Sequence, residues 1–102
     1  MPVEDLIERI DAEWDRESGF FGRLRSGRFD PDDVERVCDL LAEVGPSPDG
    51  CLHPRLVALT WYIPSFMLWQ RDRVMSNGGD LAAYRRAEVA ILNVLEERLG
   101  TP

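Results

Sequence analysis

Apolar side chains recur every three or four residues in four segments of this 102-residue chain, and residues typical of helix ends separate the segments. Such spacing places the apolar side chains on one side of an α-helix, whereas a half-buried β-strand requires strict alternation. The four segments are residues 2–16, 31–44, 56–75 and 81–99, with a short aromatic-glycine segment at 20–25. The sequence therefore predicts an all-α protein of one domain, residues 1–102, in which four main helices and a short aromatic-glycine helical turn form a compact bundle.

Capping residues mark two of the helix starts. Asp30 precedes Pro31, so the aspartate can cap the helix while the proline takes its first position, where no backbone N–H is needed. Asp80 stands in the same place before the last helix, and Gly100 is expected to end that helix.

Residues 56–63 form an almost continuous apolar run. The secondary structure of this run is open, because eight such residues fit a buried strand as well as a buried helix. We prefer the helix, since the apolar pattern continues beyond Pro64 and no second strand-like run exists to pair with this one. Pro64 has no N–H to donate to the carbonyl of Thr60, so we predict one helix that is kinked there.

The segment Ser18–Asp30 combines three glycines with three arginines. A phosphate cradle is one interpretation, but the segment has neither the lysine of a P-loop nor the glycine spacing of a nucleotide fingerprint. We prefer the interpretation that Phe20, Phe21, Leu24 and Phe29 hold a tight turn on the core. The arginines would then pair with the acidic helices on either side.

The charge of the chain is strongly acidic, with 19 Asp and Glu against 12 Arg and a net charge of -7. Such a field repels nucleic acids and anionic membranes and favours a basic partner. Residues 1–20 carry -5 and residues 30–50 carry -6, whereas residues 21–29 carry +3 and residues 51–79 carry +2. The acidity therefore belongs to the first two main helices.

Carboxylates form a row along each of these two helices. The first row is Glu4, Glu8, Asp11 and Asp15, and the second is Asp32, Glu35, Asp39 and Glu43. Like charges at helical spacing repel by a few tenths of a kcal/mol per pair. One interpretation is that both rows are solvated faces of amphipathic helices. The other is that the eight residues form one anionic face that binds a basic partner.

Aromatic residues cluster at Trp61, Tyr62, Phe66 and Trp69. Most of the cluster is expected in the core, since a domain of this size has few other large side chains to fill it. Trp61 and Trp69 cannot both share one face with the rest, so an exposed indole is expected. Beside Arg71 and Arg73, such an indole is typical of a protein interface.

The residues that could carry catalysis or bind metal are few. His53 is the only histidine, and Cys38 and Cys51 lie outside the spacings of zinc or redox motifs. The carboxylates lie in solvated rows, where nothing raises the pKa of one above another. We therefore expect a protein that is not an enzyme and that holds no metal or cofactor. With no secretory leader and no disulfide framework, we expect a cytoplasmic location.

Two stretches resemble small helical immunity proteins of bacterial polymorphic toxin systems: SGFFGRLRSGRFD (Ser18–Asp30) and LVALTWYIPSFMLWQRDRV (Leu56–Val74). The resemblance implies a protein that binds a cognate toxin and blocks it, with no catalytic residues of its own. We expect a monomer or weak homodimer whose acidic helical face neutralises a basic toxin domain, such as a nuclease. The alternative is a helical scaffold that self-associates through the aromatic residues of the third main helix.

Overall fold

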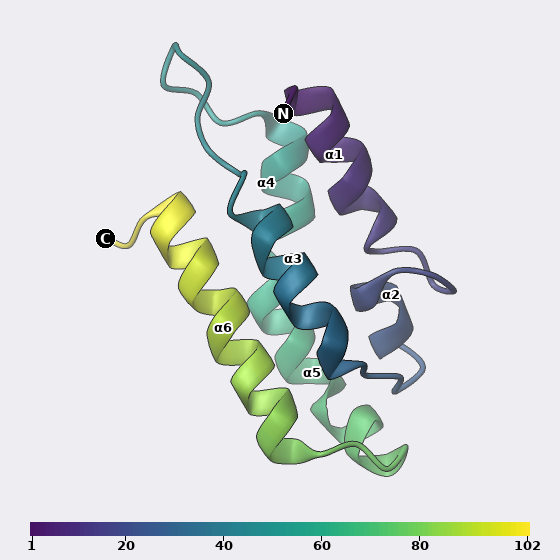
Figure 1. The fold of residues 1–102 in the computed structure, drawn as a ribbon. Helices are drawn as coiled ribbons and strands as arrows, with labels where there is room; N and C mark the ends of the chain where they lie inside the picture. Colours follow the sequence, from purple (N-terminus) through teal and green to yellow (C-terminus); the bar gives the residue numbers. More distant parts are fainter.

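The computed structural model describes all 102 residues, and it contains helices, turns and loops but no β-strand (Figure 1). In chain order the helices are α1 (Val3–Ala12), α2 (Phe20–Leu24), the 3-10 turn η1 (Pro31–Asp33), α3 (Val34–Leu41), α4 (Pro54–Thr60), α5 (Ile63–Ser76) and α6 (Leu81–Leu99). The predicted all-α fold, with a short aromatic-glycine helix after the first main helix, is confirmed.

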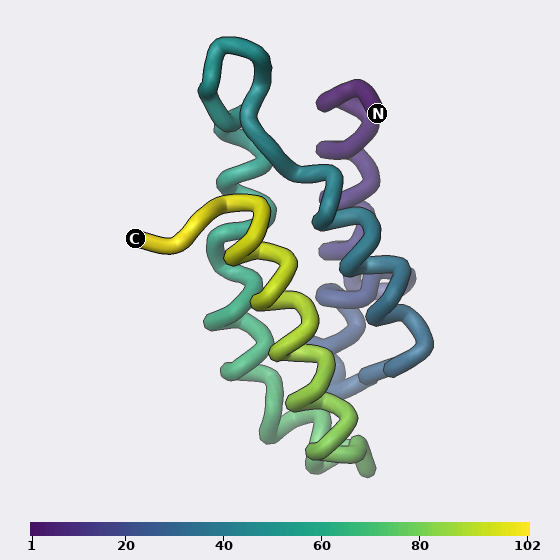
Figure 2. Tube along the Cα trace, turned by 60° about the vertical axis from the view of Figure 1, so that its left-hand side comes forward, coloured from purple at the N-terminus to yellow at the C-terminus, as the bar shows by residue number.

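The helices form a bundle in which α4 and α5 follow one another as a single column (Figure 2). α1 packs against α3 and α4, α6 packs against α3 and α5, and the short α2 packs against α5. α3 makes no extensive contact with α4 or α5, so it lies diagonally across the bundle from their column. None of the helices combines the length and apolar composition that a membrane-spanning segment requires.

One hydrophobic cluster of 18 buried residues joins the helices. The predicted stripes supply much of it, including Leu6 and Ile10 of α1, Val37 and Leu41 of α3, and Tyr84, Ala87, Ile91 and Leu95 of α6. Helical spacing in the sequence therefore identified the sides of α1, α3 and α6 that face inward.

The predicted capping residues act as expected. The side chain of Asp30 accepts a hydrogen bond from the backbone N–H of Asp32 at 3.0 Å, and Asp80 caps α6 through the N–H of Ala82 at 2.9 Å. Gly100 follows α6 with a φ of 85°, a left-handed conformation that glycine adopts without strain. The first helix is shorter than predicted and ends at Ala12, because the chain turns there to receive α2.

The third main helix is broken rather than kinked, so the prediction of one helix through Pro64 was wrong. α4 ends at Thr60, α5 begins at Ile63, and Trp61 and Tyr62 lie between them. Pro64 falls in the first turn of α5, where backbone N–H groups have no acceptor within the helix. The absence of an N–H on Pro64 therefore costs no helical hydrogen bond. The strand alternative for residues 56–63 is also excluded, since this stretch contains α4.

Candidate functional site

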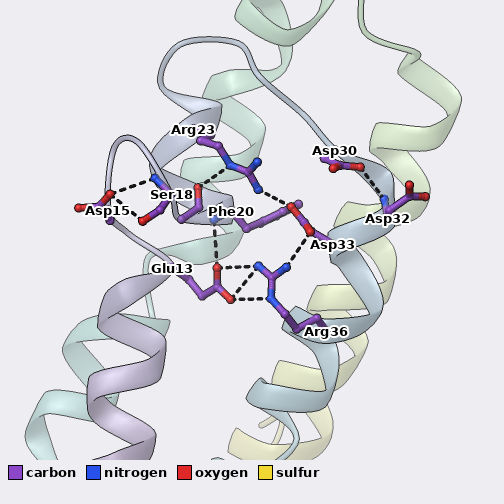
Figure 3. A network of polar contacts seen from close by, with 10 residues as sticks. Glu13, Asp15, Ser18, Phe20, Arg23, Asp30, Asp32, Asp33 and Arg36 are labelled. Carbon is purple, nitrogen blue, oxygen red and sulfur yellow. Dashed lines mark hydrogen bonds and ion pairs between the residues drawn. The ribbon is translucent and has the colours of Figure 1, made fainter.

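Glu13 organises the junction at which α1 ends and α2 begins (Figure 3). Its backbone carbonyl accepts hydrogen bonds from the N–H groups of Phe21 at 2.8 Å and Gly22 at 3.1 Å. Its side-chain Oε1 accepts from the N–H of Phe20 at 3.1 Å. The N–H groups of Phe20, Phe21 and Gly22 at the start of α2 are thereby satisfied within the protein, so this helix start offers none of them to a phosphate.

The glycines of this segment allow backbones to approach closely. A Cβ on Gly22 would lie 1.8 Å from the carbonyl oxygen of Asp15, and one on Gly19 would lie 2.4 Å from the carbonyl of Glu13. Gly27 has a φ of 75°, and a Cβ there would lie 2.5 Å from the carbonyl oxygen of Arg73. The glycine pattern therefore serves to pack α2 tightly between α1 and α5.

An ion-pair network then ties α1 and α2 to α3. Arg36 of α3 binds the carboxylate of Glu13 at 2.9 Å and that of Asp33 at 2.6 Å, and Arg23 of α2 also pairs with Asp33 (Figure 3). Hydrogen bonding to Glu13 raises the pKa of Arg36. Burial raises the pKa of Asp33, but hydrogen bonds from Arg23 and Arg36 outweigh it and leave that pKa below its usual value.

The arginines of the turn only partly behave as predicted. Arg23 pairs with Asp33, and Arg28 lies 3.9 Å from Glu17, so both face acidic groups. Arg25 instead places its guanidinium over the rings of Trp14 and Phe66, at 5.7 and 5.5 Å from the ring centroids. The attraction of a cation to an aromatic face replaces an ion pair there.

A groove of about 910 Å³ runs between α1 and α3, beside the ion-pair network. All four carboxylates of the second predicted row are among the residues that line it: Asp32, Glu35, Asp39 and Glu43. All four are exposed, and none has a cation within ion-pair distance. Glu13, Arg9 and Arg36 also line the groove. Arg36 is already held by Glu13 and Asp33, so Arg9 is the one arginine of the groove that stands free against the four carboxylates. The groove therefore presents an excess of unpaired negative charge.

The first predicted row does not join this groove. Arg9 and Ala12 of α1 line it, together with Glu13 directly after the helix, whereas Glu4, Glu8, Asp11 and Asp15 do not. Asp11 pairs with Arg55 of α4 at 2.9 Å. Asp15 accepts hydrogen bonds from the N–H and hydroxyl groups of Ser18, which lower its pKa. The structure thus brings the four carboxylates of the α3 side together, without those of α1.

The aromatic cluster divides between core and surface. Phe66 is buried, whereas Tyr62, Trp61 and Trp69 are exposed, with 65% of Trp61 and 73% of Trp69 accessible to solvent. The core expectation therefore holds for Phe66 alone. Trp61 and Trp69 lie at the surface of the α4–α5 column, as a possible interface requires.

The remaining candidates for chemistry are accounted for structurally. His53 caps α4, because its Nδ1 accepts a hydrogen bond from the N–H of Arg55 at 3.0 Å. Cys38 is half-buried and Cys51 is exposed, and they form no disulfide. No group of three or more His, Cys, Asp or Glu side chains has the geometry to hold a metal ion.

The sequence reasoning did not identify Glu13, which is 8% exposed and forms the centre of the junction. Its position carried a signal, because Glu13 follows Leu6 by seven residues and Ile10 by three. A carboxylate on the apolar stripe of a helix is expected to have a buried partner. Arg36, the one cation of the second acidic helix, was the matching residue.

No known protein family, curated protein or solved structure matches this chain.

Proposed function

We propose that this protein is a non-catalytic immunity protein that neutralises a basic toxin domain through the groove between α1 and α3. The observation that supports the proposal is the row formed by Asp32, Glu35, Asp39 and Glu43, which lines the groove without any ion-pair partner. Partners for carboxylates are available elsewhere in the protein, since Asp11, Asp33 and Glu88 are all paired with arginines.

The rigid setting of the row favours binding. α3 is fixed to α1 and α2 by Glu13, Asp33, Arg23 and Arg36, so the backbone that carries the carboxylates is held in place before a partner arrives. A partner then loses little free energy in ordering this surface. Arginines or lysines that enter the groove would find several acceptors and relieve the mutual repulsion of the row.

The spacing of the row also indicates the class of toxin. Glu35 and Asp39 follow one another by one turn of α3, which places them about 5–6 Å apart, and Glu43 lies four residues further on, in the turn that follows the helix. A line of regularly spaced negative charges presents the same pattern as the phosphates of a nucleic acid. A nuclease toxin, whose substrate surface is basic, would therefore be blocked by charge mimicry.

The carboxylates of α1 contribute to this binding at longer range. Glu4 and Glu8 are exposed and unpaired, and their field adds to that of the groove without contact with the partner. Such charges raise the rate of association more than they lower the rate of dissociation. We therefore expect fast association that slows steeply as salt is added.

A stopped-flow measurement tests the proposal. The probe is the basic C-terminal domain of the large toxin that the neighbouring gene is expected to encode. The variant combines Glu35→Gln, Asp39→Asn and Glu43→Gln. The variant should associate about tenfold more slowly at low salt and show a flatter salt dependence. Glu4→Gln with Glu8→Gln is the matched control, and its effect should be smaller because these residues lie outside the groove.

Two outcomes would overturn the proposal. One is a triple variant whose association rate and salt dependence equal those of the parent. The other is loss of protection against the toxin in cells that express His53→Ala, where circular dichroism and thermal unfolding show that this variant is as well folded as the parent. The proposed mechanism gives His53 no part beyond capping α4.

A further inference from the structure

The outer side of the α4–α5 column carries an uncovered apolar patch. Ile63, Phe66 and Met67 of α5 are buried in the core, whereas Leu68 and Trp69 of the same helix are exposed. The exposed side of α5 is otherwise polar, with Ser65, Asp72 and Ser76. A large apolar patch with a polar rim is typical of a protein interface.

The exposed residues lie on one side of the column because helical geometry continues across the break. Trp61 and Tyr62 both have right-handed helical backbone angles. The N–H of Trp61 bonds the carbonyl of Val57, and the N–H of Phe66 bonds that of Tyr62. Val57, Trp61 and Leu68 are spaced by four and seven residues and so project in nearly the same direction. With Trp69 beside Leu68, we name these four residues the aromatic face.

The area of this face approaches that of a protein interface. A fully exposed tryptophan presents ~250 Å², so Trp61 and Trp69 together leave about 350 Å² uncovered. Val89 and Leu92 of α6 extend the apolar surface next to Leu68, across a shallow groove between α5 and α6. The largest patch on a typical monomer is ~300–600 Å², and a standard interface covers ~800 Å² on each partner.

Charge identifies the partner. Each molecule carries -7, so two copies repel one another through most of their surface. The column is the exception, because residues 56–70 contain no charged side chain and residues 51–79 carry +2. α3 with its carboxylates lies diagonally across the bundle, so contact at the aromatic face keeps the two acidic grooves apart. We propose that a second copy of this chain covers the aromatic face in a symmetric dimer.

The ends of the column make the face complementary to itself. Asp72 lies near the end of α5 and has no ion-pair partner in its own chain. Arg55 lies at the start of α4, where it pairs with Asp11 but keeps about half of its side chain exposed, so its guanidinium has further N–H groups to donate. In a two-fold arrangement with antiparallel columns, the axis passes near Pro64 and each Asp72 approaches Arg55 of the other copy. A symmetric interface of this kind closes after two molecules.

Sedimentation equilibrium of the full chain, from micromolar to millimolar concentration, tests the dimer. The parent should pass from monomer to dimer, and Trp61→Ala with Trp69→Ala should weaken association by about 30-fold or more. Asp72→Arg should weaken it several-fold, because it places two arginines opposite each other. Leu99→Ala, which shortens an exposed apolar side chain elsewhere on α6, is the control and should leave the dimer unchanged.

Salt separates this interaction from toxin binding. Screening weakens the repulsion between two molecules of charge -7, so the dimer should become tighter as salt is added, whereas toxin binding should weaken. Circular dichroism of each variant establishes that it is folded, as expected for changes at exposed side chains.

Three results would overturn the dimer. The parent could remain monomeric at every concentration, or its dimer could survive replacement of both tryptophans. The third is a monomer whose tryptophan fluorescence shifts to the blue with phosphatidylcholine vesicles, which would assign the face to a membrane surface. None of these results depends on the groove between α1 and α3, so the dimer and the toxin proposal can fail separately.

Discussion

Glu13, at the end of the first helical segment, binds Arg36 of α3 through three hydrogen bonds of 2.9–3.2 Å. The two residues are 23 positions apart in the chain, and the same carboxylate caps α2 through the N–H of Phe20. One buried side chain thus connects three helices and fixes the wall of the acidic groove.

Replacement of this carboxylate should therefore cost more than replacement of its exposed neighbours. Glu13→Gln removes the charge that Arg36 binds, and we expect a loss of ~2 kcal/mol in the free energy of unfolding, since Arg36 is half-exposed and screened. Urea unfolding at neutral pH measures it. Glu35→Gln, on the exposed row, should change stability by less than ~0.5 kcal/mol. Equal losses in both variants would contradict the role of Glu13.

Asp33 should make the protein sensitive to acid. Its pKa is lowered in the folded protein, so its contribution is complete above the unfolded value of ~3.9 and is lost as the pH falls through the lower folded value. Asp33→Asn should be less stable than the parent at neutral pH by ~1 kcal/mol, and this difference in the free energy of unfolding should become smaller near pH ~3. Urea unfolding at both pH values tests this, with Asp32→Asn as the unpaired control. A stability difference between Asp33→Asn and the parent that is the same at both pH values would refute the prediction.

Gly22 should tolerate no side chain. Gly22→Ala would place a Cβ 1.8 Å from the backbone carbonyl oxygen of Asp15, and neither backbone can move without opening the junction at Glu13. We expect a loss of at least ~3 kcal/mol or failure to fold, measured by thermal unfolding. At Gly45 the nearest atom is the end of the Arg98 side chain, so Gly45→Ala should be far milder. Similar losses at the two glycines would show that close packing is not the cause.

Neutralising the row on α3 should stabilise the protein. Glu35, Asp39 and Glu43 repel one another without relief, so the triple Gln/Asn/Gln variant should gain ~0.5 kcal/mol at low salt. The gain should vanish at ~1 M salt, where charges are screened beyond ~3 Å. Glu88→Gln, which breaks an ion pair with Arg71, should have the opposite sign and provides the control. A triple variant less stable than the parent would mean that the row has partners within the fold.

Tyr84 should contribute through one buried hydrogen bond. Its hydroxyl donates to the carbonyl of Met67 at 2.6 Å, and burial raises its pKa well above the usual range. Tyr84→Phe should lose ~1 kcal/mol, whereas Tyr62→Phe at the surface should lose less. Because the unfolded side chain ionises near pH ~10, the contribution should decline above that pH. Urea unfolding of both variants at neutral and alkaline pH measures these losses in the free energy of unfolding. Equal losses in the two variants, or a Tyr84→Phe loss that does not decline above pH ~10, would contradict this role.

Local features were predictable because their partners lie within a few residues. The cap formed by Asp30 depends on an N–H only two positions away, and Gly100 ends α6 through its own backbone conformation. The helical spacing of the carboxylates on α3 is equally local, and the structure keeps that row intact. The break at Trp61 was missed because the sequence shows that Pro64 disrupts a helix but not whether the chain bends or begins a new one there.

Helical spacing was enough to predict the helical class of the fold, the inward sides of α1, α3 and α6, and the two rows of carboxylates. The burial of Glu13 against Arg36, and the groove that the second row lines and the first row does not join, could not be predicted in this way. Spacing along a helix gives directions relative to that helix alone. How α1 is turned toward α3 depends on the packing of side chains that are distant in the sequence.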